Sequence, residues 1–112
     1  MKYGLPDAAI GKICAVLRRY PQVERAILYG SRAKGNYKKG SDIDLTLHGS
    51  VELTLHVLYK ILDDLDELLL PYTIDLSIFD NIDDPEVIDH IQRVGGAFYE
   101  RGEAAPEVVA AA

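Results

Sequence analysis

The sequence predicts an α/β domain, and three observations lead to this fold class. Residues 41–48 and 73–79 alternate polar and apolar side chains, the period of two that is typical of strands. Residues 7–20 and 84–94 repeat apolar side chains every three or four positions, as amphipathic helices do. The apolar segment 23–29 ends at a Gly-Ser pair. A strand that leads into such a turn commonly carries a ligand site at the edge of an open α/β sheet.

The bounds of the helices and strands are predicted from prolines, glycines and capping residues at their ends. The first helix begins at Pro6 and Asp7 and stops before Pro21, and residues 23–29 and 41–48 form the first two strands. A long helix over 52–70, ended by Pro71, and a strand over 73–79 come next. Asp84 is expected to cap the last helix, which ends at 95–96.

The rest of the chain is expected to add little regular structure. Phe98 and Tyr99 are interpreted as a final packing contact. The Ala-rich segment 103–112 is expected to be a flexible tail. With 112 residues the chain fits one domain, over 1–102, and leaves no room for a second substrate-recognition domain.

The segment 30–44 carries the functional signal. Gly30 and Ser31 let backbone amides approach a phosphate closely, because glycine has no Cβ and the chain turns into a helix start. Asp42 and Asp44 follow on the second strand, where their spacing of two places both carboxylates on one face. Two such carboxylates can share Mg²⁺, so this segment predicts metal-dependent phosphoryl chemistry with a Mg-nucleotide.

Three familiar nucleotide or metal motifs do not fit this segment. A Walker loop needs Lys and then Ser or Thr after the second glycine, whereas Asn36 and Tyr37 follow Gly35. As a calcium loop, the segment would need a turn glycine and a closing glutamate, and it has neither. The Gly-rich fingerprint of dinucleotide-binding proteins does not follow any predicted strand.

A third carboxylate lies on the strand over 73–79. There Asp75, Ser77 and Phe79 share one face, while the aliphatic side chains lie on the other. If this strand neighbours the second one with matching faces, Asp75 joins Asp42 and Asp44. Like charges packed so closely are tolerated mainly where divalent cations neutralise them, so a two-metal cluster is expected.

These residues resemble the nucleotidyltransferase superfamily that includes DNA polymerase beta. The likeness rests on Gly30-Ser31, Asp42-x-Asp44 and the later Asp75, and it covers nearly the whole chain. In its short length and its sequence Gly-Ser-Arg-Ala-Lys-Gly, the chain resembles the minimal nucleotidyltransferases. Many of these are antitoxins paired with a HEPN ribonuclease toxin. The resemblance implies a small mixed sheet flanked by helices.

The resemblance also implies the chemistry and the role of each residue. ATP and two Mg²⁺ ions would bind at the carboxylates, and AMP would pass to an acceptor hydroxyl, a tyrosine of the HEPN toxin in the antitoxin members. The residues that would bind the metals and carry out catalysis are Asp42, Asp44 and Asp75. The residues that would bind the nucleotide are Gly30, Ser31, Arg32 and Ser41. Two alternatives stay open: an antitoxin that neutralises its partner by binding alone, and a small-molecule nucleotidyltransferase.

The composition of the chain limits which binding partners and which cellular compartment we expect. The formal charge of −6 disfavours direct nucleic-acid binding, since Lys and Arg supply most of that affinity. A partner chain or a second copy of this chain is implied, because the acceptor site must come from elsewhere. We expect a soluble cytoplasmic protein without membrane contact. The sequence has one cysteine, and it shows neither a charged leader before an apolar core nor a long apolar run.

Overall fold

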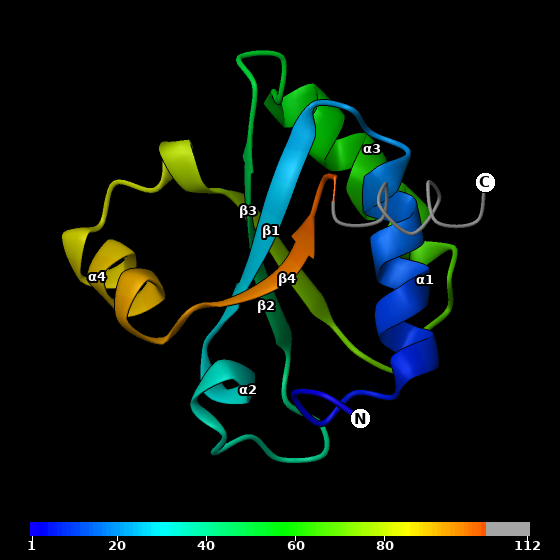
Figure 1. Ribbon diagram of the computed structural model, residues 1–112, viewed down its shortest axis with the longest axis vertical. Helices are drawn as coiled ribbons and strands as arrows, with labels where there is room; N and C mark the ends of the chain where they lie inside the picture. Colours follow the sequence, from blue (N-terminus) through cyan, green and yellow to red (C-terminus); the bar gives the residue numbers. More distant parts are fainter. Residues whose placement is uncertain (103–112) are drawn as a thin grey trace.

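The computed structural model describes residues 1–102 as a four-stranded mixed sheet with helices on both faces. The strand order is β3-β2-β1-β4. Strand β1 (Val23–Tyr29) runs antiparallel to β2 (Ile43–Gly49) and to β4 (Gly96–Glu100), whereas β3 (Ile74–Ile78) runs parallel to β2. In Figure 1, helices α1 (Asp7–Arg18) and α3 (Leu55–Asp66) lie on one side of the sheet and α4 (Pro85–Val94) on the other. The predicted fold class, a small mixed α/β sheet flanked by helices, is confirmed.

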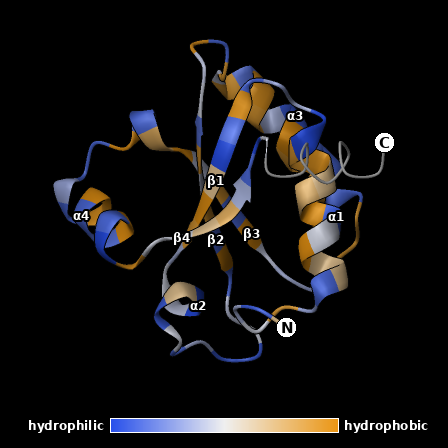
Figure 2. Ribbon diagram, in the orientation of Figure 1, coloured by the Kyte–Doolittle hydropathy of each residue, from blue (hydrophilic) through white to orange (hydrophobic). Residues whose placement is uncertain are grey.

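The hydrophobic core lies between the sheet and the helix pair α1 and α3. Figure 2 shows apolar residues concentrated along the strands and on these two helices. Burial of each large aliphatic side chain contributes roughly 1.5–3 kcal/mol, so this layer holds the sheet against the helices. Its main members are Ile13, Val16 and Leu17 of α1, Leu58, Ile61 and Leu65 of α3, and Leu28, Ile43, Leu45, Leu47, Leu76 and Ile78 of the sheet.

Helix α3 is shorter than the sequence pattern predicts. The expected range of 52–70 is wrong at both ends, because the helix covers Leu55–Asp66. Thr54 caps its start by accepting a hydrogen bond from the Val57 amide at 3.4 Å. Leu69, with φ of +54°, lies in the left-handed region and is incompatible with a continuing helix. Apolar residues beyond a helix end can mimic its periodicity when they pack on the same core.

The structure contains a fourth strand that the sequence pattern did not predict. Residues 96–100, interpreted only as a packing contact, form β4 beside β1. Two neighbouring glycines lie where this segment begins, and glycine is rare in strands. The pair Phe98–Tyr99 is too short to show the alternation of polar and apolar residues that predicts a strand. The other helix and strand predictions agree with the structure to within two residues.

Two further expectations concern the end of the chain and the membrane. The expected tail over 103–112 lies outside the described residues, so that expectation stays untested. Across residues 1–102, each helix is too short or too polar to cross a membrane.

Candidate active site

Three polar side chains form a row across one face of the sheet. Asp44 of β2 pairs with Asp75 of the parallel strand β3, and on its other side with Tyr29 of β1. Residues paired directly across neighbouring strands have Cβ atoms about 4.5–5.5 Å apart. The expected convergence of Asp44 and Asp75 on one sheet face therefore agrees with the strand register.

The glycine that follows β1 packs directly against one of these carboxylates. Gly30 follows β1 and has φ of +78° and ψ of −157°, a conformation almost restricted to glycine. A Cβ at this position would collide with Oδ2 of Asp44. Gly30 is also the N-terminal residue flanking the short helix α2 (Ser31–Lys34), so the chain turns from strand to helix beside the carboxylate. The signal Gly30-Ser31 thus reflects a close approach that only glycine permits.

The pKa of Asp44 shows that the carboxylates act on one another. It is raised above 3.8, first by partial burial and then by the charges of Asp75 and Asp42, while His90 acts in the opposite sense. Each neighbouring negative charge disfavours ionisation of Asp44. The arrangement leaves a negative field that a cation would neutralise.

The other predicted residues lie around this centre in different environments. Asp42 is exposed and directly precedes β2, and Ser31 is half-buried at the start of α2. Ser41 closes a turn, since its hydroxyl accepts a hydrogen bond from the Lys38 amide at 2.8 Å. Within residues 1–102, no three His, Cys, Asp or Glu side chains are already gathered to hold one metal ion. The strand register makes Asp44 and Asp75 direct neighbours, whereas the two-metal cluster of all three carboxylates stays a prediction.

Arg32 differs from the expectation of a phosphate ligand. Its side chain is only 2% exposed. The guanidinium donates to the Ser41 carbonyl from Nε at 3.1 Å and from Nη2 at 2.9 Å, and to the Tyr3 carbonyl at 2.9 Å. The rings of Tyr37 and Tyr72 lie 5.4 and 5.3 Å from it. These contacts make Arg32 the anchor of the loop that leads into Asp42, with its donors turned toward the protein.

The sequence pattern missed His90, which lies at this site. The Gly30 amide donates a hydrogen bond to Nε2 of His90 at 3.2 Å. The imidazole also meets the Tyr29 ring edge-on, with 6.2 Å between ring centroids. A lone histidine on an amphipathic helix 60 residues further along the chain gives no local signal, so only tertiary structure could identify it.

Tyr29 is a second residue whose place becomes clear in the structure. Burial raises the pKa of its phenol, a hydrogen bond with Ser77 lowers it, and the charges of Asp75 and Asp44 raise it further. The phenol therefore stays protonated beside the carboxylates and reaches toward β3.

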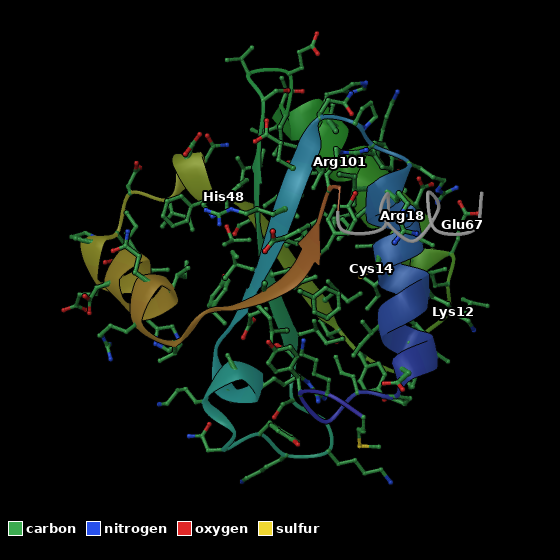
Figure 3. All side chains as sticks on the ribbon, in the orientation of Figure 1. Lys12, Cys14, Arg18, His48, Glu67 and Arg101 are labelled. Atoms are coloured by element: carbon green, nitrogen blue, oxygen red, sulfur yellow. The ribbon has the colours of Figure 1, made fainter. Side chains whose placement is uncertain are left out.

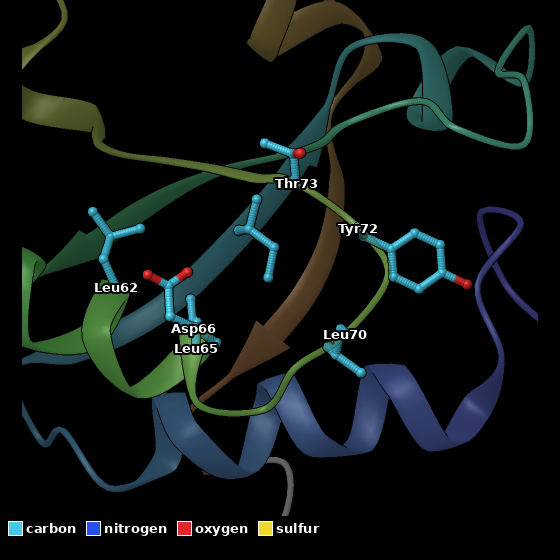
Figure 4. A pocket seen from close by; sticks show the side chains of 7 residues that line it. Leu62, Leu65, Asp66, Leu70, Tyr72 and Thr73 are labelled. Atoms are coloured by element: carbon cyan, nitrogen blue, oxygen red, sulfur yellow. The ribbon is translucent and has the colours of Figure 1, made fainter.

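Several hollows in residues 1–102 lie outside the carboxylate row, and two of them are next to the sheet. One of about 360 Å³ lies beneath α4, between Ile27, His48, Phe79 and Ile91. Figure 3 shows His48 on the α4 side of the sheet, away from Cys14 of α1. The other, of about 220 Å³, lies between the end of α3 and the segment into β3 and is lined by Leu62, Leu65 and Tyr72 (Figure 4). Asp42, Asp44 and Asp75 line neither hollow, so both are separate from the candidate active site.

The fold and the site together define a nucleotidyltransferase domain, and comparison with known families agrees. A family described as "Polymerase beta, Nucleotidyltransferase" matches residues 11–104. The chain therefore belongs to the polymerase beta family of nucleotidyltransferases. A search of curated proteins finds no match.

Solved structures with this fold include several toxin-antitoxin complexes. A toxin-antitoxin complex with AMP-PNP matches with a TM-score of 0.66 and 20% identity, over 85% of this chain and 76% of that chain. The MntA-HepT toxin-antitoxin matches with a TM-score of 0.63 and 17% identity, over 88% and 76%. A tri-AMPylated HEPN toxin of Shewanella oneidensis in complex with an MNT antitoxin matches with a TM-score of 0.62 and 17% identity, also over 88% and 76%. These likenesses establish a shared fold.

Proposed function

We propose that this protein is a Mg²⁺-dependent adenylyltransferase that moves AMP from ATP to a tyrosine hydroxyl of a HEPN-type toxin and thereby acts as its antitoxin. The observation that carries the proposal is the pairing of Asp44 with Asp75 beside the Gly30 turn, in a chain of the nucleotidyltransferase family. A carboxylate pair next to a phosphate-accepting turn is what transfer of a nucleotidyl group requires.

The donor set fits a divalent cation. Carboxylate oxygens are the ligands that Mg²⁺ prefers, and Asp42, Asp44 and Asp75 would hold it after side-chain movement. The raised pKa of Asp44 supports this fit, because burial raises it first and the neighbouring charges of Asp75 and Asp42 raise it further. When bound, divalent cations neutralise phosphate charge and lower the pKa of the acceptor hydroxyl. We propose that two Mg²⁺ ions bind.

The protein's own groups would orient the substrate and accept a proton. Gly30 and Ser31 would hold the triphosphate through backbone amides and the Ser31 hydroxyl, with Ser41 on the neighbouring turn. Asp75, exposed at the edge of the row, would accept the proton of the attacking hydroxyl. The hydroxyl oxygen would bond to the α-phosphorus as the bond to pyrophosphate breaks.

The partner assignment draws on the structures that share the fold. They include a toxin-antitoxin complex with AMP-PNP and a tri-AMPylated HEPN toxin with its MNT antitoxin. The described domain of this chain is small, so a partner would supply the acceptor. We further propose that the protein works in the cytoplasm and forms a hetero-oligomer with that toxin.

One experiment tests the proposal directly. A purified HEPN-type toxin, the proposed partner, is incubated with ATP and Mg²⁺ and either the wild-type protein or Asp44→Asn, and the mass of the toxin is then measured by mass spectrometry. We expect the mass of AMP to be added by the wild type only, with Asp44→Asn still folded. Neutralisation of the toxin without ATP and without added mass would favour inhibition by binding alone. Transfer of AMP only to a free small-molecule hydroxyl would contradict the partner assignment.

A further inference from the structure

We propose that His90 is a nucleotide-site residue that accepts the hydrogen bond of the Gly30 amide and releases this amide when the triphosphate binds. The proposal rests on the proposed function, because it names a further residue of the same site and couples helix α4 to nucleotide binding.

His90 and a bound phosphate would compete for one donor. The Gly30 N–H already donates to Nε2 of His90 at 3.2 Å. A backbone amide has one hydrogen, and a phosphate oxygen that accepts it would face the lone pair of Nε2. Two acceptors cannot share that position favourably. The triphosphate and His90 therefore exclude each other at this amide.

Helix α4, which carries His90, is weakly held on the sheet. Of its residues, Ile91 alone is buried. The hollow of about 360 Å³ lies beneath the helix, so the packing there is incomplete. Elements with few buried apolar contacts open at low free-energy cost. The packing of α4 thus allows it to shift without disrupting the core on the opposite face.

The connection at the end of α4 also permits movement. Gly95 alone joins the helix to Gly96, the first residue of β4, and a Cβ at Gly95 would collide with the Ile91 carbonyl. A glycine at this one-residue link has a wider choice of φ and ψ than any other residue would have. The helix can therefore change its angle while β4 stays paired with β1.

The imidazole of His90 makes a second contact within the site. Its ring also meets the ring of Tyr29, which lies in the carboxylate row. Release of His90 therefore removes a ring from the site at the same time as it frees the amide. One movement opens both the phosphate position and the space above Tyr29.

The test combines nucleotide binding with hydrogen exchange and needs no acceptor. The probe is AMP-PNP with Mg²⁺, measured by calorimetry on the wild type, His90→Ala and Gln92→Ala. The control residue Gln92 is on the same helix and borders the hollow, whereas the hydrogen bond with Gly30 comes from His90. We expect His90→Ala to bind AMP-PNP about two- to tenfold more tightly, because one competing hydrogen bond is gone, and Gln92→Ala to bind like the wild type.

Hydrogen exchange on the wild type supplies a readout that does not depend on any variant. We expect AMP-PNP and Mg²⁺ to speed exchange of the α4 amides while they protect the amides of Gly30 and Ser31. His90→Ala should show fast α4 exchange without nucleotide. Slower or unchanged α4 exchange on binding, or weaker binding by His90→Ala, would overturn the inference and make His90 a ligand or a bystander.

Failure of this inference can be told apart from failure of the proposed function. If the wild type binds AMP-PNP but α4 exchange does not rise, only the role of His90 is wrong. If the wild type binds no AMP-PNP with Mg²⁺, both proposals are wrong.

Discussion

Asp44 and Asp75 are direct neighbours across the parallel strands β2 and β3, with their side chains on the same face of the sheet. Burial of Asp44 raises the pKa of its carboxyl, and the negative charge of Asp75 beside it raises that pKa further. Burial and repulsion together make the ionised form of Asp44 costly and leave a site that can attract a cation.

Asp44→Asn is expected to raise the free energy of unfolding near pH 7. The pKa of Asp44 is raised in the folded protein, so the stability this group contributes is present below its ordinary pKa of 3.8 and lost as the pH rises through the folded value. Asparagine resembles the neutral form at every pH. The gain over the wild type should therefore grow as the pH rises from 3.8 through the raised pKa of the folded protein and stay constant above it, as measured by urea unfolding.

Asp63→Asn is the matched control, because Asp63 is exposed on α3, on the other side of the sheet. It should not reproduce a gain that grows with pH. A loss of stability at pH 7 in Asp44→Asn would contradict the electrostatic interpretation of the row.

The sequence alone predicted which strand face carries the acids, but not their register. Alternation with period two assigns Asp44 and Asp75 to the polar faces of their strands. A shift of one residue in pairing would send one carboxylate to the helix side, and no local pattern fixes that choice. The register follows from the burial of Leu45 and Leu76 against α1 and α3, which is a property of the whole core.

Arg32→Met is expected to lower the free energy of unfolding by about 3 kcal/mol. The change removes hydrogen bonds from a charged donor to the carbonyls of Ser41 and Tyr3, each worth roughly 1.5–3 kcal/mol. The proposed AMP transfer should fall as well, because the turn before Asp42 loses its anchor. Lys34→Met, at an exposed position on the same short helix, should cost less than about 0.5 kcal/mol. Equal stabilities of the two variants in urea unfolding would show that Arg32 is not an anchor.

The inward role of Arg32 could not be predicted from the sequence. It lies among Lys34, Lys38 and Lys39 in a loop that looks uniformly basic and solvated. Its burial depends on Tyr3 and Tyr72, which come from the N-terminal segment and from the segment before β3. His90 was missed for the same reason, since the group it contacts is 60 residues away.

His48 is expected to titrate below its ordinary pKa of 6.5. Burial lowers the pKa, and the nearby charge of Arg25 lowers it further. Stability from the neutral ring is therefore present above pH 6.5 and lost as the pH falls through the lower pKa of the folded protein. In NMR titrations, Arg25→Gln should move the pKa of His48 upward, whereas Lys60→Gln on α3 should leave it in place. A wild-type pKa of 6.5 or above would contradict the prediction.

Gly30→Ala is expected to abolish AMP transfer and to cost about 1–3 kcal/mol of stability, because its φ and ψ lie in a region almost restricted to glycine. The added Cβ would also push the Asp44 carboxylate from its place. Gly35→Ala separates the two effects, since Gly35 has φ of +86° with open space around a Cβ. It should lose about 1 kcal/mol and keep its binding of Mg²⁺ and AMP-PNP. Urea unfolding and calorimetry on both variants measure this difference. Equal binding by the two would show that the contact between Gly30 and Asp44 does not shape the site.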